Sequence, residues 1–163
     1  FVYPLGFYSK KIHQLSALAP NSLVAIPNDP SNEGRALLLL QQNKLIQLDP
    51  KAGLFATPKS IVRNPLGLRF KELDTAQLPR SMSDATLVAL TNDFVGLVGL
   101  TPNAALLKES KNSPYANVIV IRANQSINRA FRALVAVMHS PKIIKATYAA
   151  YPDGGAVAAF TPT

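Results

Sequence analysis

A short apolar run at residues 23–26 is followed, after a polar turn, by a predicted helix that ends near residue 42. This unit limits the chain to folds that combine strands with helices. Residues 23–26 predict a strand, and the helix after the polar turn begins at Pro30. Asp29 suits the helix cap, and Pro30 suits the first position, where a missing N–H costs nothing. Arg35 lies in the first turns and predicts, beside the free N–H groups there, a receptor for a carboxylate or phosphate. Composition alone favours the alternative of an ordinary surface arginine.

The same alternation continues along the chain. Strands are predicted over residues 5–8, 23–26, 68–73, 86–90 and 117–121, and helices over residues 30–42, 58–63, 75–82, 93–99, 127–138 and 141–150. This order favours an α/β fold with a mostly parallel sheet flanked by helices. In such sheets, ligands lie beyond the carboxyl ends of the strands.

Composition excludes several classes of protein. The chain has 163 residues, 48% of them hydrophobic and 16% charged, which is typical of one globular domain with a substantial core. No apolar run approaches the roughly 20 residues that a membrane-spanning helix needs. The absence of cysteine excludes disulfides, thiolate metal sites and a cysteine nucleophile.

The net charge of +8 raises the question of a nucleic-acid partner. The basic residues are scattered, however, and do not alternate with aromatic residues as an RNA-binding surface requires. We therefore expect a solvated basic surface and no nucleic-acid binding. A surface that faces anionic membrane headgroups is the alternative.

The residues that usually carry catalysis are missing. The two histidines, His13 and His139, lie in a polar segment and at a predicted helix end, where structural roles are typical. The carboxylates show no paired or histidine-adjacent arrangement, and no nucleotide-binding or nucleophile motif is present. We expect neither an enzyme, nor a metal site, nor a cofactor.

Polar residues at strand ends remain as candidates for binding. Arg35, Asn92 and Asn117 each lie beside a predicted strand. A guanidinium and two amides are the minimum set for holding an α-amino acid, since the guanidinium binds its carboxylate and amide oxygens accept from its ammonium group. The alternative is that both asparagines cap local backbone groups.

Several segments together resemble the methionine-binding lipoprotein family, the substrate-binding subunits of bacterial methionine importers. The similarity rests on residues 4–12, 24–41, 56–62, 76–80, 113–120 and 154–157, which follow in family order. It covers essentially the whole chain.

The resemblance implies two lobes of the type II periplasmic-binding-protein kind that close around a ligand. Arg35 would bind the ligand carboxylate, and Asn92 and Asn117 would bind its head group; Thr91 or Asp93 could take the place of Asn92. The expected ligand is methionine, with another small amino acid or a methionine-containing dipeptide as alternatives. The expected partners are the permease and ATPase of an ABC importer.

The resemblance also implies a division of the chain. Residues 1–22 would be a strand and crossover from the first lobe, residues 23–112 the second-lobe ligand-binding domain, and residues 113–163 a return crossover with C-terminal helices. Most of the first lobe would be missing, so this portion could dimerise. The full-length form would be a lipid-anchored protein of the periplasm or cell surface. The competing hypothesis is a surface interaction protein that keeps the fold and binds envelope or host partners.

Overall fold

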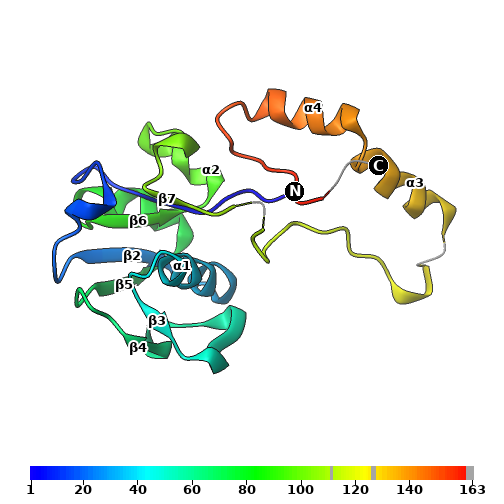
Figure 1. Cartoon of the computed structure of the whole chain (residues 1–163). Helices are drawn as coiled ribbons and strands as arrows, with labels where there is room; N and C mark the ends of the chain where they lie inside the picture. Colours follow the sequence, from blue (N-terminus) through cyan, green and yellow to red (C-terminus); the bar gives the residue numbers. More distant parts are fainter. Residues whose placement is uncertain (111, 126–127, 161–163) are drawn as a thin grey trace. The chain divides into compact units, whose positions relative to one another are not determined.

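The computed structural model describes residues 1–110, 112–125 and 128–160, which divide into two compact units (Figure 1). We call Leu5–Glu109 the sheet unit. We call Phe1–Pro4 with Ser110–Thr163, as far as described, the terminal unit. The sheet unit begins at Leu5, and the division of the chain that the resemblance implies stays a prediction.

A five-stranded sheet forms the centre of the sheet unit. Its strands, in the order β5-β2-β6-β1-β7, are β5 (Arg69–Leu73), β2 (Leu23–Pro27), β6 (Leu87–Leu90), β1 (Gly6–Tyr8) and β7 (Leu107–Lys108). β2 is parallel to β5 and β6, while β1 is antiparallel to both β6 and β7. Only β1 runs against the other four strands, so the sheet is mixed but mostly parallel. The expected α/β class is confirmed.

The central strands β1, β2 and β6 are buried on both faces, and they are apolar at nearly every position. Val24 and Ile26 of β2 join a cluster with Leu37 and Leu40 from α1 (Pro30–Gln42). Ala25, which points to the opposite face, joins a second cluster of buried apolar side chains. Continuous apolar runs of this kind are typical of parallel strands covered on both sides.

The helix α1 has the predicted bounds. The Asp29 side chain accepts a hydrogen bond from the Asn32 N–H at 3.0 Å, and Pro30 occupies the first turn. At the other end, the Asn43 side-chain amide donates to the Leu39 carbonyl at 2.8 Å. The capping residues therefore define both ends of this helix.

The remaining elements of the sheet unit are short. They are η1 (Leu15–Ala17), β3 (Gln47–Leu48), η2 (Pro50–Phe55), η3 (Pro58–Ser60), β4 (Ile61–Arg63), η4 (Thr75–Ser83), α2 (Asn92–Val95), η5 (Gly96–Val98) and η6 (Pro102–Ala104). The terminal unit contains η7 (Ala123–Gln125), α3 (Arg129–Met138) and α4 (Pro141–Ala150). The helix predicted over residues 141–150 is confirmed; Ile127, in the helix predicted over residues 127–138, lies outside the described residues.

Two predicted elements are wrong. The helix predicted over residues 58–63 is a single 3₁₀ turn followed by β4, because the β-branched Ile61 and Val62 continue into an antiparallel pair with β3. The strand predicted over residues 117–121 forms no strand pairing within the described chain. The Asn117 N–H instead donates to the Phe1 carbonyl at 2.8 Å.

Gly34 allows α1 to approach the chain at η2. A Cβ atom at this position would lie 2.1 Å from the Leu54 carbonyl oxygen. We expect Gly34→Ala to lower the free energy of unfolding by about 2–4 kcal/mol, because the backbone clash outweighs the ~1 kcal/mol that alanine gains in a helix. Chemical denaturation followed by circular dichroism measures this loss.

Gly96→Ala is the matched control. Gly96 has an ordinary helical φ of −62°, and a Cβ there would meet nothing within 4 Å. The unfolding free energy of Gly96→Ala should stay within about 0.5 kcal/mol of the wild-type value or rise slightly. Equal stability of the two variants would contradict this account of α1 packing.

Candidate ligand-binding site

Two of the predicted binding residues follow the carboxyl ends of neighbouring parallel strands. β2 leads into α1, which carries Arg35, and β6 leads through Thr91 into α2, whose first residue is Asn92. Because β2 and β6 are parallel and paired, their carboxyl ends lie at the same edge of the sheet. This edge is where an α/β sheet usually binds its ligand.

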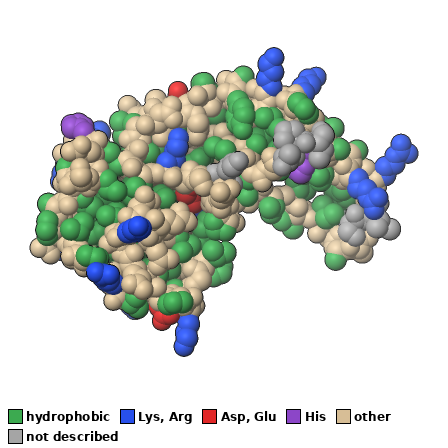
Figure 2. Space-filling view, in the orientation of Figure 1, with side chains coloured by type: hydrophobic (Ala, Val, Ile, Leu, Met, Phe, Trp, Pro, Cys, Tyr) green, Lys and Arg blue, Asp and Glu red, His purple; other side chains and the backbone are tan. Residues whose placement is uncertain are grey.

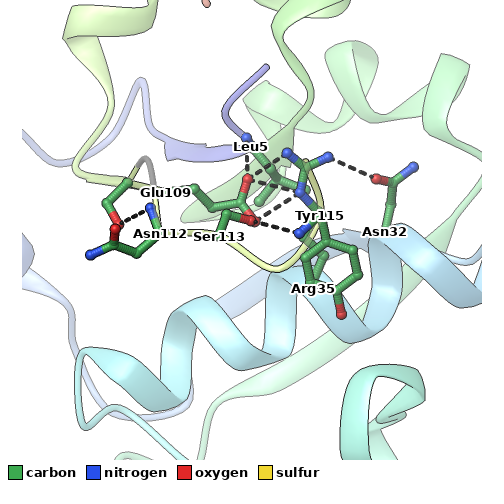
Figure 3. A network of polar contacts seen from close by, with 8 residues as sticks. Leu5, Asn32, Arg35, Glu109, Asn112, Ser113 and Tyr115 are labelled. Atoms are coloured by element: carbon green, nitrogen blue, oxygen red, sulfur yellow. Dashed lines mark hydrogen bonds and ion pairs between the residues drawn. The ribbon is translucent and has the colours of Figure 1, made fainter. Parts of the chain in front are cut away.

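Arg35 is held at that edge by a buried carboxylate (Figure 3). Its Nε lies 2.8 Å from both carboxylate oxygens of Glu109, and its Nη2 lies 2.5 Å from Glu109 Oε2. The two side chains are only 11% and 6% exposed. Asn32, one turn earlier on α1, accepts a hydrogen bond from Nη1 at 3.4 Å. Arg35 is therefore not the surface arginine that composition favours.

Glu109 also joins this pair to the central sheet. Its Oε2 accepts a hydrogen bond from the Leu5 N–H at 2.9 Å, and its own N–H donates to the Leu5 carbonyl at 3.0 Å. Gly6, the next residue, is paired in register with both Leu90 of β6 and Lys108 of β7. The ion pair thus connects α1 with β1 and with the chain just after β7, close to where β6 ends.

The N-terminus of α1 itself is acidic and capped. Burial raises the pKa of Asp29, but hydrogen bonds from Asn32 and Thr75 together outweigh it and lower the pKa below its usual value. Burial, reinforced by Glu72 and Asp29, raises the pKa of Glu33 to about 7. The sequence predicted an anion receptor formed by Arg35 and the free N–H groups; here the Asn32 N–H is bonded to Asp29, and Arg35 is bonded to Glu109.

The two predicted asparagines belong to different units. Asn92 is half-buried at the start of α2, with Thr91 at the helix cap and Asp93 exposed. Asn117 lies in the terminal unit, where it is exposed and lines a cavity formed within that unit. The structure therefore brings Arg35 and Asn92 to one edge of the sheet, and the role of Asn117 stays a prediction.

Sequence reasoning missed Glu109, the residue that positions Arg35. The two residues are 74 positions apart, and no local pattern links them. Only the pairing of β1 with β7 brings Glu109 to Leu5 and from there to α1. Among the described residues, no group of three or more histidine and carboxylate side chains could hold a metal ion.

Comparison with known proteins decides the family. The family model described as NlpA lipoprotein matches residues 1–160. The chain belongs to the NlpA lipoprotein family. This membership agrees with the resemblance found in the sequence, and the six segments that carry it lie within the matched range.

Curated NlpA relatives include proteins named for methionine. The chain is 41% identical to the D-methionine-binding lipoprotein MetQ of Escherichia coli K12 over 160 residues, which are 96% of this chain and 59% of that protein. It is 42% identical to the MetQ of Yersinia pestis with the same coverage. The chain therefore spans less than two thirds of the length of these relatives.

Solved structures agree with the family and the fold. A nutrient-binding protein from Burkholderia cenocepacia bound to methionine is 39% identical, with a TM-score of 0.83; the match covers 98% of this chain and 67% of that one. The crystal structure of the methionine-binding protein MetQ is 41% identical, with a TM-score of 0.79. The match covers 96% of this chain and 65% of the MetQ chain. These similarities confirm the expected binding-protein fold.

The Glu109 carboxylate should be a major determinant of stability. Glu109→Ala removes the partner of a buried guanidinium and the acceptor of the Leu5 N–H, so we expect a loss of about 3–5 kcal/mol in the free energy of unfolding. Denaturant titration measures this loss. Asp93→Ala, which removes an exposed carboxylate from the same unit, should stay within about 0.5 kcal/mol of the wild type. Similar losses in both variants would refute the assigned role.

Glu33 should make the sheet unit less stable at pH 7 and above than at pH 4. Its side chain is 6% exposed, and Oε1 has no hydrogen-bond partner among the described residues. A carboxyl group whose folded-state pKa is raised binds its proton more tightly in the folded state, so stability falls as the pH rises from about 4.5 to about 7. We expect Glu33→Gln to unfold with a free energy about 1–3 kcal/mol above wild type at pH 8.

The comparison at pH 4 provides the control for this effect. There the wild-type Glu33 is mostly protonated in both states, so the advantage of Glu33→Gln should largely disappear. A constant difference between the two proteins at pH 4 and pH 8 would show that the raised pKa does not cause it.

Proposed function

We propose that this chain is part of the substrate-binding component of an ABC importer that captures an amino acid, with methionine as the favoured ligand. The observation that carries the proposal is the NlpA family match over residues 1–160, together with MetQ relatives that are 41–42% identical over 96% of the chain. The component would bind its ligand by closure and pass it to the membrane-embedded permease.

The sheet unit would bind the carboxylate and the ammonium group of the amino acid. Arg35 would bind the ligand carboxylate, with Glu109 holding the guanidinium plane in a fixed orientation. The Asn92 amide oxygen would accept from the ammonium group at the same sheet edge. A guanidinium that is fixed in advance loses less side-chain entropy on binding, which favours affinity.

The transport role also suggests a location and partners. The family description as lipoprotein supports a periplasmic or surface protein with a lipid anchor, and the partners would be the permease and ATPase of the importer. Within the described part of the chain, no helix is both long and apolar enough to cross a bilayer. The binding step itself requires no chemical reaction and no cofactor.

Asn92 should contribute directly to ligand affinity. The test uses a chimera in which residues 1–160 replace the homologous segment of the E. coli K12 MetQ, titrated calorimetrically with L- and D-methionine. We expect one-to-one binding, and we expect Asn92→Ala to weaken it about tenfold, because one hydrogen bond to a charged group is lost.

Asn103→Ala is the matched control, since Asn103 is exposed in the same unit and accepts only a 3.3 Å hydrogen bond from Lys108 among its described contacts. The Asn103→Ala chimera should bind methionine with the same affinity as the parent chimera. A chimera that folds but binds no amino acid would refute the proposed function. Equal affinities for Asn92→Ala and the parent would exclude Asn92 from the site.

A further inference from the structure

The strand β5 forms an open edge of the central sheet. It is the last strand in the sheet order, and in the described chain it pairs only with β2. The Arg69 N–H and the Leu73 carbonyl bond to the chain at the two ends of β2, at 3.0 and 2.8 Å. Since backbone groups alternate along a strand, the N–H and C=O groups of Phe70 and Glu72 point away from β2.

A pocket lies beside this edge, where the cover on one face of the sheet ends. On that face, η4 packs against β2 and β6. The pocket has a volume of about 350 Å³, and its lining comes from β5, from η4 and from the residue after η4. The lining residues are Lys71, Leu73, Gln77, Arg80, Ser81 and Asp84.

The pocket is basic, and its cations are unpaired. Lys71 and Arg80 are exposed, and in the described part of the chain their side chains form no hydrogen bond or ion pair. Arg69 lies on the same face of β5 as Lys71, two residues earlier. Asp84 is the one carboxylate in the lining, and Lys11 Nζ donates to its backbone carbonyl at 2.6 Å. Four cations therefore surround one acid.

The chain offers few carboxylates to these cations. It has 17 lysines and arginines but only nine aspartates and glutamates. Figure 2 shows Lys and Arg side chains at several places on the drawn face of the sheet unit, and Asp and Glu side chains at fewer. A partner that carries carboxylates would complement the basic groups beside β5.

A second copy of β5 fits this edge poorly. In a symmetric antiparallel pair of strands, the residue at the centre lies opposite itself. A pair centred on Lys71 or on Glu72 sets two like charges directly opposite each other, and a pair centred on Phe70 sets Lys71 opposite Arg69. Like charges in these positions destabilise the pairing. The charges of β5 therefore oppose self-association at this edge.

We propose that the open edge of β5 is a docking site for an extended acidic segment of a partner protein, which adds a strand to the sheet. The backbone groups of Phe70 and Glu72 would bond to the added strand. Acidic side chains opposite Arg69 and Lys71 would lie on the face of the pocket, within reach of Arg80. The proposal is independent of the candidate ligand-binding site, since it uses neither Arg35 nor Asn92.

Hydrogen exchange of the 163-residue chain, followed by NMR during titration with peptides, tests this proposal. The probe is a blocked seven-residue peptide of alternating threonine and glutamate, which presents its acids on one face in either strand direction. At saturation, exchange of the Phe70 and Glu72 amides should slow by about fivefold or more, while exchange in β6 stays unchanged. A peptide of alternating threonine and lysine should have no effect.

Lys71→Glu and Lys59→Glu provide the matched comparison. Lys59 is an exposed cation of η3 in the same unit, so Lys59→Glu makes the same charge change away from the edge. Lys71→Glu should weaken binding of the glutamate peptide by about tenfold or more, and Lys59→Glu should leave it within about twofold.

Four results would overturn the proposal. The glutamate peptide fails to slow exchange at the two amides, or Lys71→Glu binds it as well as the wild type does. The lysine peptide or free glutarate slows exchange there to the same extent, which would mean nonspecific association or a site for small anions. The two amides are already protected in the chain alone, which would mean that a second copy covers the edge.

Discussion

The buried pair of Arg35 and Glu109 is the interaction on which the organisation of the sheet edge depends. It joins the second turn of α1 to the backbone of Leu5 and to the end of β7. The carboxylate is carried by the residue that follows β7, and it bonds to the other two segments. A buried pair of this kind costs desolvation, so its value lies in fixing one geometry more than in adding stability.

The first turns of α1 carry both signs of charge, which bears on the type of ligand. Asp29 and Glu33 lie at the start of the helix, and the positive charge of Arg35 is balanced by Glu109. A strongly anionic ligand such as a phosphate would meet little net positive charge here. A zwitterionic amino acid offers both a carboxylate for Arg35 and an ammonium group for the acidic side chains near it, which favours the proposed ligand class.

The sequence was sufficient for the α/β class and for the elements defined by local signals. Asp29 and Pro30 predicted the start of α1 because caps act over one turn of helix, and the apolar run of β2 predicted a buried strand. Glu109 could not be found in this way, because its role depends on strand pairing between distant segments. The strand predicted over residues 117–121 failed for a related reason: a strand needs a partner, and the described chain supplies none.

The central proposal is that Arg35, held by Glu109, would bind the carboxylate of an amino acid. The most direct measurement is the affinity of the chimera and its Arg35→Lys variant for methionine and for methionine amide, which lacks the carboxylate. Lysine keeps the charge but loses the bidentate geometry. The account predicts that Arg35→Lys weakens methionine binding by about tenfold or more and leaves amide binding within about twofold. An equal loss for both ligands would contradict it, because Arg35 would then act on the fold and not on the carboxylate.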